Sequence, residues 1–179
     1  MKEKIAPTLV LGVLCLIAAL LLAAVNGVTA PLIEKITIEN ANAARQEVMP
    51  EASSFEAVDC DFVEGVTEVY KSSNETGYVI TAAAKGFGGN ITVMTAITPD
   101  GSIEAIKVTD ASNETPGLGS KTTTPEHAAK FAGLSSISMD DKAAPDYVAP
   151  VSGASYSSKG VFNAVNAALE QFAKIGGAQ

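Results

Sequence analysis

The side chains best suited to chemistry lie in residues 151–158, Val-Ser-Gly-Ala-Ser-Tyr-Ser-Ser, here called the serine segment. Directly after it, apolar residues recur at the spacing of one buried helix face, at Val161, Val165, Ala168, Leu169 and Phe172. We expect Ser157 or Ser158 to cap this helix. Ser155 then lies just outside the N-terminus, where free N–H groups and the helix dipole favour an anion. The segment predicts a phosphate site, although such segments are more often only caps and turns.

A second unusual segment, Asn-Glu-Thr-Pro-Gly-Leu-Gly, spans residues 113–119. The Pro116-Gly117 pair predicts a tight turn. Gly119 predicts a further unusual backbone angle or a ligand close by. Glu114 has a carboxylate that can accept hydrogen bonds from backbone N–H groups and hold the turn. A turn with no further role remains the alternative.

The elements that position these segments are predicted from alternation and turn residues. Short β-prone runs follow one another through short turns, which predicts an antiparallel sheet, with strands at 66–70, 77–82, 91–97 and 103–108 and turns at 74–77 and 99–101. The glycine loop at 85–90 is followed by a strand, so it does not fit a dinucleotide fingerprint. A helix capped by Thr124, with Pro125 at its first position, and the C-terminal helix should cover the sheet.

The N-terminal region predicts a membrane anchor. No charged residue occurs from Ile5 to Val25, and these 21 positions would span roughly 30 Å as a helix, the thickness of the hydrocarbon core. Lys2 and Lys4 precede this run and no further basic residue follows until Lys35, which predicts a cytoplasmic N-terminus and an extracytoplasmic C-terminal domain. A cleaved signal peptide is the alternative.

The residues after the anchor are predicted to connect it to the folded domain. Asn26–Pro31 is interpreted as the exit from the membrane. An amphipathic helix is expected over Ile33–Met49, ended by Pro50. The acidic stretch Glu51–Glu64 is interpreted as a solvated connection.

Composition excludes several classes of function. The net charge is −8, from 20 acidic and 12 basic residues, which argues against nucleic-acid binding. The single His and two Cys do not supply a conventional zinc site, and Cys15 and Cys60 are expected to be free thiols. A serine hydrolase is also excluded. Ser155 has only His127 as a possible base, and the residues on either side of Ser155 lack the glycine pattern of the strand-to-helix turn that carries a hydrolase nucleophile.

Three segments, at 85–93, 113–121 and 152–155, occur in this order behind one predicted span. Together they resemble the G subunit family of Rnf electron-transport complexes, and more distantly the C subunit of sodium-pumping NADH:quinone reductases. The resemblance covers nearly the whole chain and implies an α+β fold. One N-terminal transmembrane helix would precede a mainly antiparallel sheet flanked by helices, the FMN-binding domain. The implied division is an anchor at 1–30, a connection at 31–65 and the FMN-binding domain at 66–179.

The resemblance also implies the cofactor, FMN, joined through its phosphate to a hydroxyl in a Ser/Thr-Gly-Ala-Thr/Ser motif. Carried onto this sequence, the attachment residue is Ser155, a serine where the family usually has threonine. The other implied cofactor-binding residues come from the two unusual segments, namely Ser152, Gly153, Ala154, Glu114, Thr115, Pro116, Gly117, Leu118 and Gly119. Leu118 and Tyr156 are candidate walls for the flavin ring, with a place in the core as the alternative for Tyr156. The aspartate usual for flavin transfer is replaced by Ala149, and Asp146 lies out of register.

The implied function is electron transfer within a membrane-bound, ion-translocating oxidoreductase that works between ferredoxin and NAD. The protein would have little activity alone. The implied partners are the other membrane subunits and a flavin transferase that attaches the FMN. Two alternatives remain open: an anchored assembly subunit of the same complex without covalent flavin, and a secreted binding module with an ordinary serine-rich turn.

Overall fold

The structure is a computed structural model that describes the backbone of residues 2–176 and the side chains of residues 9–33 and 35–176. The chain divides into two compact units, Met1–Ala41 and Asn42–Gln179. Within these described residues, helix α1 is the one helix long and apolar enough to cross a membrane. The side chains of Lys2 and Lys4, which carry the predicted orientation, lie outside the described residues.

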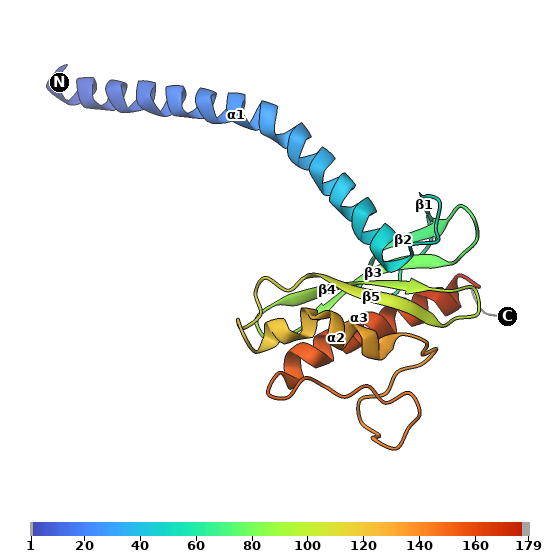
Figure 1. The fold of residues 1–179 in the computed structure, drawn as a ribbon. Helices are drawn as coiled ribbons and strands as arrows, with labels where there is room; N and C mark the ends of the chain where they lie inside the picture. The colour runs from blue at the N-terminus through green and yellow to red at the C-terminus, as the bar shows by residue number, and fades with distance from the viewer. Residues whose placement is uncertain (1, 177–179) are drawn as a thin grey trace. The chain divides into compact units, whose positions relative to one another are not determined.

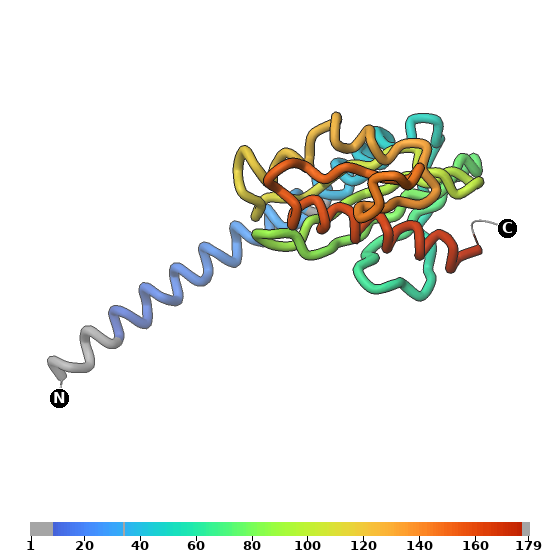
Figure 2. The backbone as a smooth tube through the Cα atoms, turned by 90° about the horizontal axis from the view of Figure 1, so that it is seen from below, coloured from blue at the N-terminus to red at the C-terminus, as the bar shows by residue number. Residues whose placement is uncertain are grey.

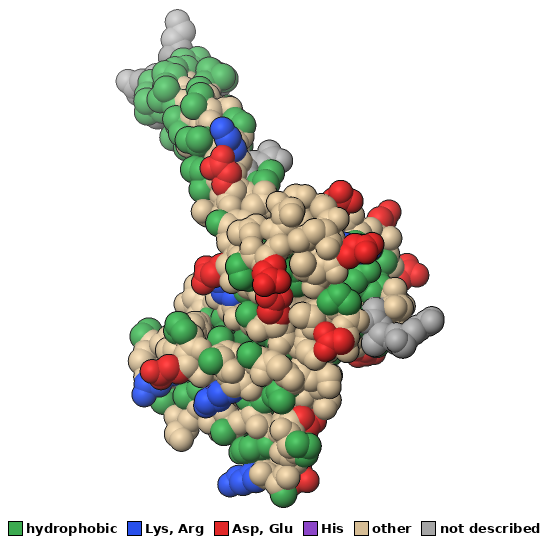
Figure 3. Space-filling model, turned by 45° about the vertical axis from the view of Figure 1, so that its right-hand side comes forward, with side chains coloured by type: hydrophobic (Ala, Val, Ile, Leu, Met, Phe, Trp, Pro, Cys, Tyr) green, Lys and Arg blue, Asp and Glu red, His purple; other side chains and the backbone are tan. Residues whose placement is uncertain are grey.

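Helix α1 runs without interruption from Lys2 to Val48, so the predicted membrane exit at Asn26–Pro31 is helical. Pro31 is tolerated inside it, although a proline withholds one N–H from the helix ladder. The helix predicted over Ile33–Met49 is the last part of α1. Large apolar side chains along the first part of α1 are exposed, and Figure 3 shows the apolar surface that they form.

The second unit contains a five-stranded sheet in the order β1-β2-β3-β4-β5, with all neighbours antiparallel (Figure 1). The strands are β1 Phe55–Ala57, β2 Val66–Ser72, β3 Tyr78–Lys85, β4 Asn90–Ile97 and β5 Ile103–Asp110. The four predicted strands and their turns are confirmed. β1 lies in the stretch interpreted as a solvated connection, and its three residues are too few for a pattern to reveal.

The two faces of the sheet are covered by different parts of the chain. Helix α3, Ser155–Lys174, lies across one face (Figures 1 and 2) and forms the main core with it. On the other face, Val48 and Met49 at the end of α1 pack against a smaller cluster that includes Val79, Met94 and Ala96. The predicted apolar face of α3 is confirmed, because Val161, Val165, Ala168 and Phe172 are buried and Leu169 is half-buried.

The connection from β5 to α3 carries only short helical turns. These are η1 Gly119–Thr123, α2 Pro125–Ala128 and η2 Ala129–Phe131. Helix α2 begins at Pro125 as predicted, but Thr124 does not cap it through its side chain. The Thr124 hydroxyl instead donates to the carbonyl of Lys121, 2.9 Å away. The Thr124 hydroxyl, which was predicted to cap α2, is therefore bonded to the preceding element η1 instead.

Candidate functional site

Helix α3 begins earlier than predicted, because its N-cap lies three residues before Ser157 and four before Ser158. Its N-cap is Ala154, and the first bond of the helix ladder joins Ser158 N–H to the Ala154 carbonyl at 2.9 Å. The predicted caps are wrong because tertiary partners engage both hydroxyls. Ser157 donates to a Glu114 carboxylate oxygen, and Ser158 Oγ accepts from Val151 N–H at 2.9 Å.

Ser155 is the first residue of α3 rather than a residue just outside it. In the described part of the chain, the N–H groups of Ser155, Tyr156 and Ser157 precede the first ladder bond and have no backbone acceptor. Such groups, at the positive end of the helix dipole, favour an anion. The predicted anion-binding character of this helix start therefore does not depend on a serine cap.

A tight turn at residues 151–154 leads the serine segment into helix α3. Ala154 N–H donates to the Val151 carbonyl at 2.9 Å, and Gly153 has a φ of +80°. A side chain is strained at that angle. A Cβ at this position would also lie 3.0 Å from Cδ1 of Leu118. The two segments singled out in the sequence thus meet at Gly153 and Leu118.

The four serines of the segment differ in accessibility. Ser157 and Ser158 are buried and hydrogen-bonded, whereas Ser152 and Ser155 are exposed. Of the two exposed serines, Ser155 lines a cavity of about 270 Å³ and Ser152 does not. Of the four serines, Ser155 is therefore the one whose exposed hydroxyl a ligand in the cavity can reach.

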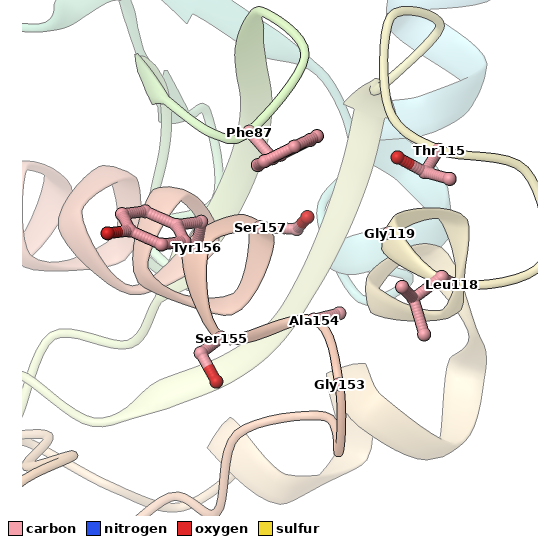
Figure 4. A pocket seen from close by; sticks show the side chains of 9 residues that line it. All are labelled: Phe87, Thr115, Leu118, Gly119, Gly153, Ala154, Ser155, Tyr156 and Ser157. Atoms are coloured by element: carbon pink, nitrogen blue, oxygen red, sulfur yellow. The ribbon is translucent and has the colours of Figure 1, made fainter.

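The cavity lies between the start of α3, the glycine loop after β3 and the turn before η1 (Figure 4). Its walls are formed by Phe87, Thr115, Leu118, Gly119, Gly153, Ala154, Ser155, Tyr156 and Ser157. The candidate wall residues Leu118 and Tyr156 both line it. Four of the other implied residues, Ser152, Glu114, Pro116 and Gly117, are not among its walls. Phe87 lines the cavity although the sequence did not single it out; its signal was an aromatic residue inside a glycine loop.

Glu114 lies behind the cavity, with only 5% of its surface exposed. One carboxylate oxygen accepts from Ser157 Oγ, and the other accepts from Gly88 N–H at 3.1 Å. Sequence analysis predicted bonds from backbone N–H groups that hold its own turn. The backbone donor comes instead from the glycine loop, so Glu114 joins that loop to the start of α3.

The turn that follows Glu114 is confirmed. Leu118 N–H donates to the Thr115 carbonyl at 3.2 Å, and Gly117 has a φ of +76°, as a tight Pro-Gly turn requires. Gly119 does not have the unusual backbone angle that was predicted as one possibility. A Cβ there would lie 2.6 Å from a Glu114 carboxylate oxygen and 2.9 Å from Ser157 Oγ, so glycine provides clearance for side-chain packing.

The two residues where the sequence departs from the implied motif, Asp146 and Ala149, contact other parts of the chain. The carboxylate of Asp146 accepts a hydrogen bond from Ser136 Oγ at 2.8 Å, away from the cavity lining. Ala149, where the resemblance implied an aspartate, has its carbonyl 3.5 Å from Lys130 Nζ. Neither residue lines the cavity.

His127 is buried apart from the cavity lining, with both ring nitrogens lacking a hydrogen-bond partner among the described residues. Burial, with a smaller contribution from Lys130, lowers the pKa of His127 to about 4. The imidazole is therefore neutral at pH 7. It does not reach Ser155 as a base would.

These features fit a ligand with an anionic end and a flat apolar body. The start of α3 supplies unpaired N–H groups and an exposed hydroxyl, whereas Phe87, Tyr156 and Leu118 supply apolar surface. FMN has this construction, with a phosphate at one end and an aromatic ring system at the other. The residues present therefore fit the group that the resemblance implies.

Comparison with known proteins gives the family. Residues 86–170 match the FMN-binding domain family. The chain is 33% identical to the G subunit of the Na(+)-translocating ferredoxin:NAD(+) oxidoreductase complex of Acetobacterium woodii, over 93% of this chain and 90% of that protein. It is 32% identical to the G subunit of the ion-translocating oxidoreductase complex of Methanosarcina acetivorans, over 94% of both chains.

A solved structure has the same fold. The C subunit of the Na(+)-translocating NADH-quinone reductase from Parabacteroides distasonis superposes with a TM-score of 0.52 and 23% identity, covering 64% of this chain and 63% of that chain. The α+β fold expected from the sequence is confirmed, with an apolar N-terminal helix and an antiparallel sheet flanked by helices. On the strength of these G-subunit relatives, the chain belongs to the Rnf G-subunit family of ion-translocating oxidoreductase complexes.

Proposed function

We propose that this protein is the electron-transfer subunit of an Rnf-type complex and carries FMN through a phosphoester on Ser155. One observation carries the proposal: Ser155 is the exposed serine of its segment that also lines the cavity at the start of α3. The G-subunit relatives and the FMN-binding match support the same function.

The helix start suits the phosphate of an attached flavin. A phosphodiester keeps one negative charge, and the unpaired N–H groups at Ser155–Ser157 can stabilise it. Ser157 and Ser158 are not competitors for the attachment, because both are buried and hydrogen-bonded. Ser152 is exposed but does not line the cavity, so a flavin attached to Ser152 would have its phosphate outside the cavity.

Attachment requires an activated donor, and a flavin dinucleotide has the required pyrophosphate. Ser155 Oγ would form a new P–O bond to the phosphorus on the FMN side and would lose its proton to the transferase. The pyrophosphate P–O bond would break, and the adenosine monophosphate half would leave. No electron is gained or lost, and Ser155 ends as a phosphodiester. The separate flavin transferase supplies the catalytic groups.

The cavity is small for a complete flavin. Its volume of about 270 Å³ falls below the roughly 300–1,000 Å³ of pockets that enclose a drug-sized ligand. Part of the FMN would therefore stay exposed, which suits electron exchange with a neighbouring protein of the complex. When bound, FMN supplies the redox chemistry; the chain's own residues bind and orient it.

The membrane context is part of the same proposal. Residues 1–30 anchor the chain in the membrane with the N-terminus in the cytoplasm. Residues 31–65 connect this anchor to the flavin domain, which residues 66–179 form on the extracytoplasmic side. The apolar helix α1 supports the anchor. The partners are the other membrane subunits of the complex, and the electrons pass between ferredoxin and NAD.

The test is co-expression of the full chain with a flavin transferase, followed by denaturing electrophoresis and detection of flavin fluorescence in the gel. The wild type and Ser152→Ala should both fluoresce, and Ser155→Thr should retain the signal because the hydroxyl is kept. Ser155→Ala should be dark. Fluorescence of undiminished strength in Ser155→Ala would refute the attachment residue.

Ala149 motivates a second candidate function. Without the aspartate usual for flavin transfer, the chain would serve the complex as an anchored assembly subunit with no covalent flavin. The mass of the intact protein, isolated from its native membrane, distinguishes the two candidates. An unmodified mass throughout supports the assembly role, and a mass increased by FMN supports the electron carrier.

A further inference from the structure

We propose that Phe87 is the wall against which the isoalloxazine ring of the flavin packs, and that Glu114 fixes this wall relative to Ser155. This inference rests on the proposed function, because it needs a flavin attached at Ser155. It adds a ring-contacting residue and a positioning residue, neither of which belongs to the attachment motif.

The distribution of exposed apolar side chains points to this site. Among the described residues 42–176, four large apolar side chains are exposed, namely Phe62, Phe87, Leu118 and Tyr156. Three of them line the cavity, and Phe62 is the exception. Exposed aromatic surface gathered at one hollow marks a ligand or interaction site, whereas isolated apolar side chains are ordinary.

Phe87 has the position that a planar ring requires. It is 69% exposed, and its ring centroid lies 6.4 Å from that of Tyr156 at an interplanar angle of 52°. Phe87 and Leu118 come from different elements and both line the cavity, and in the view of Figure 4 Ser157 lies between them. A flat ring entering from Ser155 would therefore meet both an aromatic and an aliphatic side chain. Aromatic pairs gain from offset stacking beyond simple burial.

Glu114 connects this wall to the attachment residue. One of its oxygens accepts from the N–H of Gly88, the residue after Phe87, and the other accepts from Ser157, two residues after Ser155. The carboxylate is buried, and glycines at 86 and 119 leave room for it, since a Cβ at Gly86 would lie 2.3 Å from Glu114 Oε1. Glu114 therefore hydrogen-bonds both to the loop that carries Phe87 and to the first turn of the helix that carries Ser155.

The experiment uses the full chain co-expressed with a flavin transferase and measures two quantities. Intact mass reports whether FMN is attached, and the quenching of flavin fluorescence by iodide reports how exposed the ring is. Phe87→Ala removes the wall, Phe87→Tyr keeps an aromatic face, and Phe62→Ala removes an exposed phenyl ring away from the cavity.

We expect FMN on all four proteins. The iodide quenching constant should rise about threefold in Phe87→Ala, because the ring loses its aromatic contact, and should stay at the wild-type value in Phe87→Tyr and Phe62→Ala. An unchanged constant in a flavin-loaded Phe87→Ala overturns the inference while leaving the proposed function intact. Absence of FMN from the wild-type mass overturns both.

Two further variants keep the inference testable. If Phe87→Ala does not load, Phe87→Leu takes its place, and quenching equal to wild type in the loaded Phe87→Leu protein counts against an aromatic wall. Glu114→Gln should load FMN and show an intermediate rise in quenching. A purely structural Glu114 would lower thermal stability and leave the quenching constant of the folded protein unchanged, which would remove it as a positioning residue.

Discussion

Glu114 and His127 are two buried ionisable side chains in the same connection between β5 and α3, and they have opposite surroundings. Glu114 is 5% exposed and hydrogen-bonded to Ser157 and Gly88. His127 is 3% exposed and has no hydrogen-bond partner among the described residues. Buried polar groups usually have partners, so the difference separates a group that organises the site from one that fills the core.

His127 behaves as an aromatic core residue. Its ring packs edge-on against Phe131 with centroids 5.5 Å apart, and Phe131 in turn lies 6.3 Å from Phe162 of α3. Burial lowers the pKa of His127 to about 4, so the ring is neutral at pH 7. Burial alone therefore does not identify a functional residue in this protein; the hydrogen-bond partners do.

The largest effect on stability is expected from Glu114→Ala. The substitution leaves the Ser157 hydroxyl and Gly88 N–H without their acceptor and opens a cavity, which together should lower the free energy of unfolding by about 3 kcal/mol. Chemical denaturation of the full chain in detergent measures this. Glu126→Ala, at an exposed carboxylate on α2, is the matched control and should change stability by less than about 0.5 kcal/mol. Equal effects would contradict the organising role of Glu114.

The packing around Glu114 predicts the next effect. A methyl group at Gly119 would lie 2.6 Å from a Glu114 oxygen, and we expect Gly119→Ala to cost about 2 kcal/mol through overpacking. Gly133 has a φ of +80° with nothing within 4 Å of an added Cβ, so Gly133→Ala should cost only about 1 kcal/mol for its backbone angle. Denaturation curves of the two variants measure both costs. If Gly133→Ala destabilises more, the carboxylate has room to move.

The sheet and the last helix could be predicted from the sequence because their signals are local. Alternation and turn residues located β2 to β5, and periodicity located the buried face of α3. The serine caps could not be located in this way. Ser157 finds its acceptor 43 residues earlier in the chain, and no local pattern shows that the hydroxyl is already engaged.

The cavity shows the same limit. Six of its nine lining residues are implied cofactor-binding residues, and two more, Tyr156 and Ser157, also belong to the serine segment. Phe87 comes from the glycine loop between β3 and β4 and reaches the cavity only because the sheet brings that loop beside α3. Sequence analysis excluded a dinucleotide fingerprint for this loop and assigned no role to the aromatic residue among its glycines.

The lowered pKa of His127 predicts a pH dependence. The unfolded imidazole has its usual pKa near 6.5, so between about pH 6.5 and 4 the unfolded chain binds a proton that the folded chain does not. Stability contributed by the neutral ring is therefore lost as pH falls through this window, by about 3 kcal/mol. His127→Phe should lack this part of the pH profile, measured as the difference between variant and wild-type unfolding curves. Parallel profiles would show that His127 does not titrate differently on folding.

At pH 7 the same substitution should have the smallest effect. Replacing an unpartnered polar ring by an apolar ring of similar shape leaves no hydrogen bond broken, so His127→Phe should change the free energy of unfolding by less than about 1 kcal/mol. Thermal unfolding at pH 7 checks this. A large loss would show that the imidazole has a polar partner when the protein is in water.

The mass of the intact protein isolated from membranes, in wild type and in Ser155→Ala, tests the central claim most directly. The wild type should be heavier than its sequence by one FMN less one water, and Ser155→Ala should have the mass of its sequence alone. A wild type with no added mass, or a Ser155→Ala variant that still carries the flavin, would contradict the assignment of Ser155 as the residue that holds the cofactor.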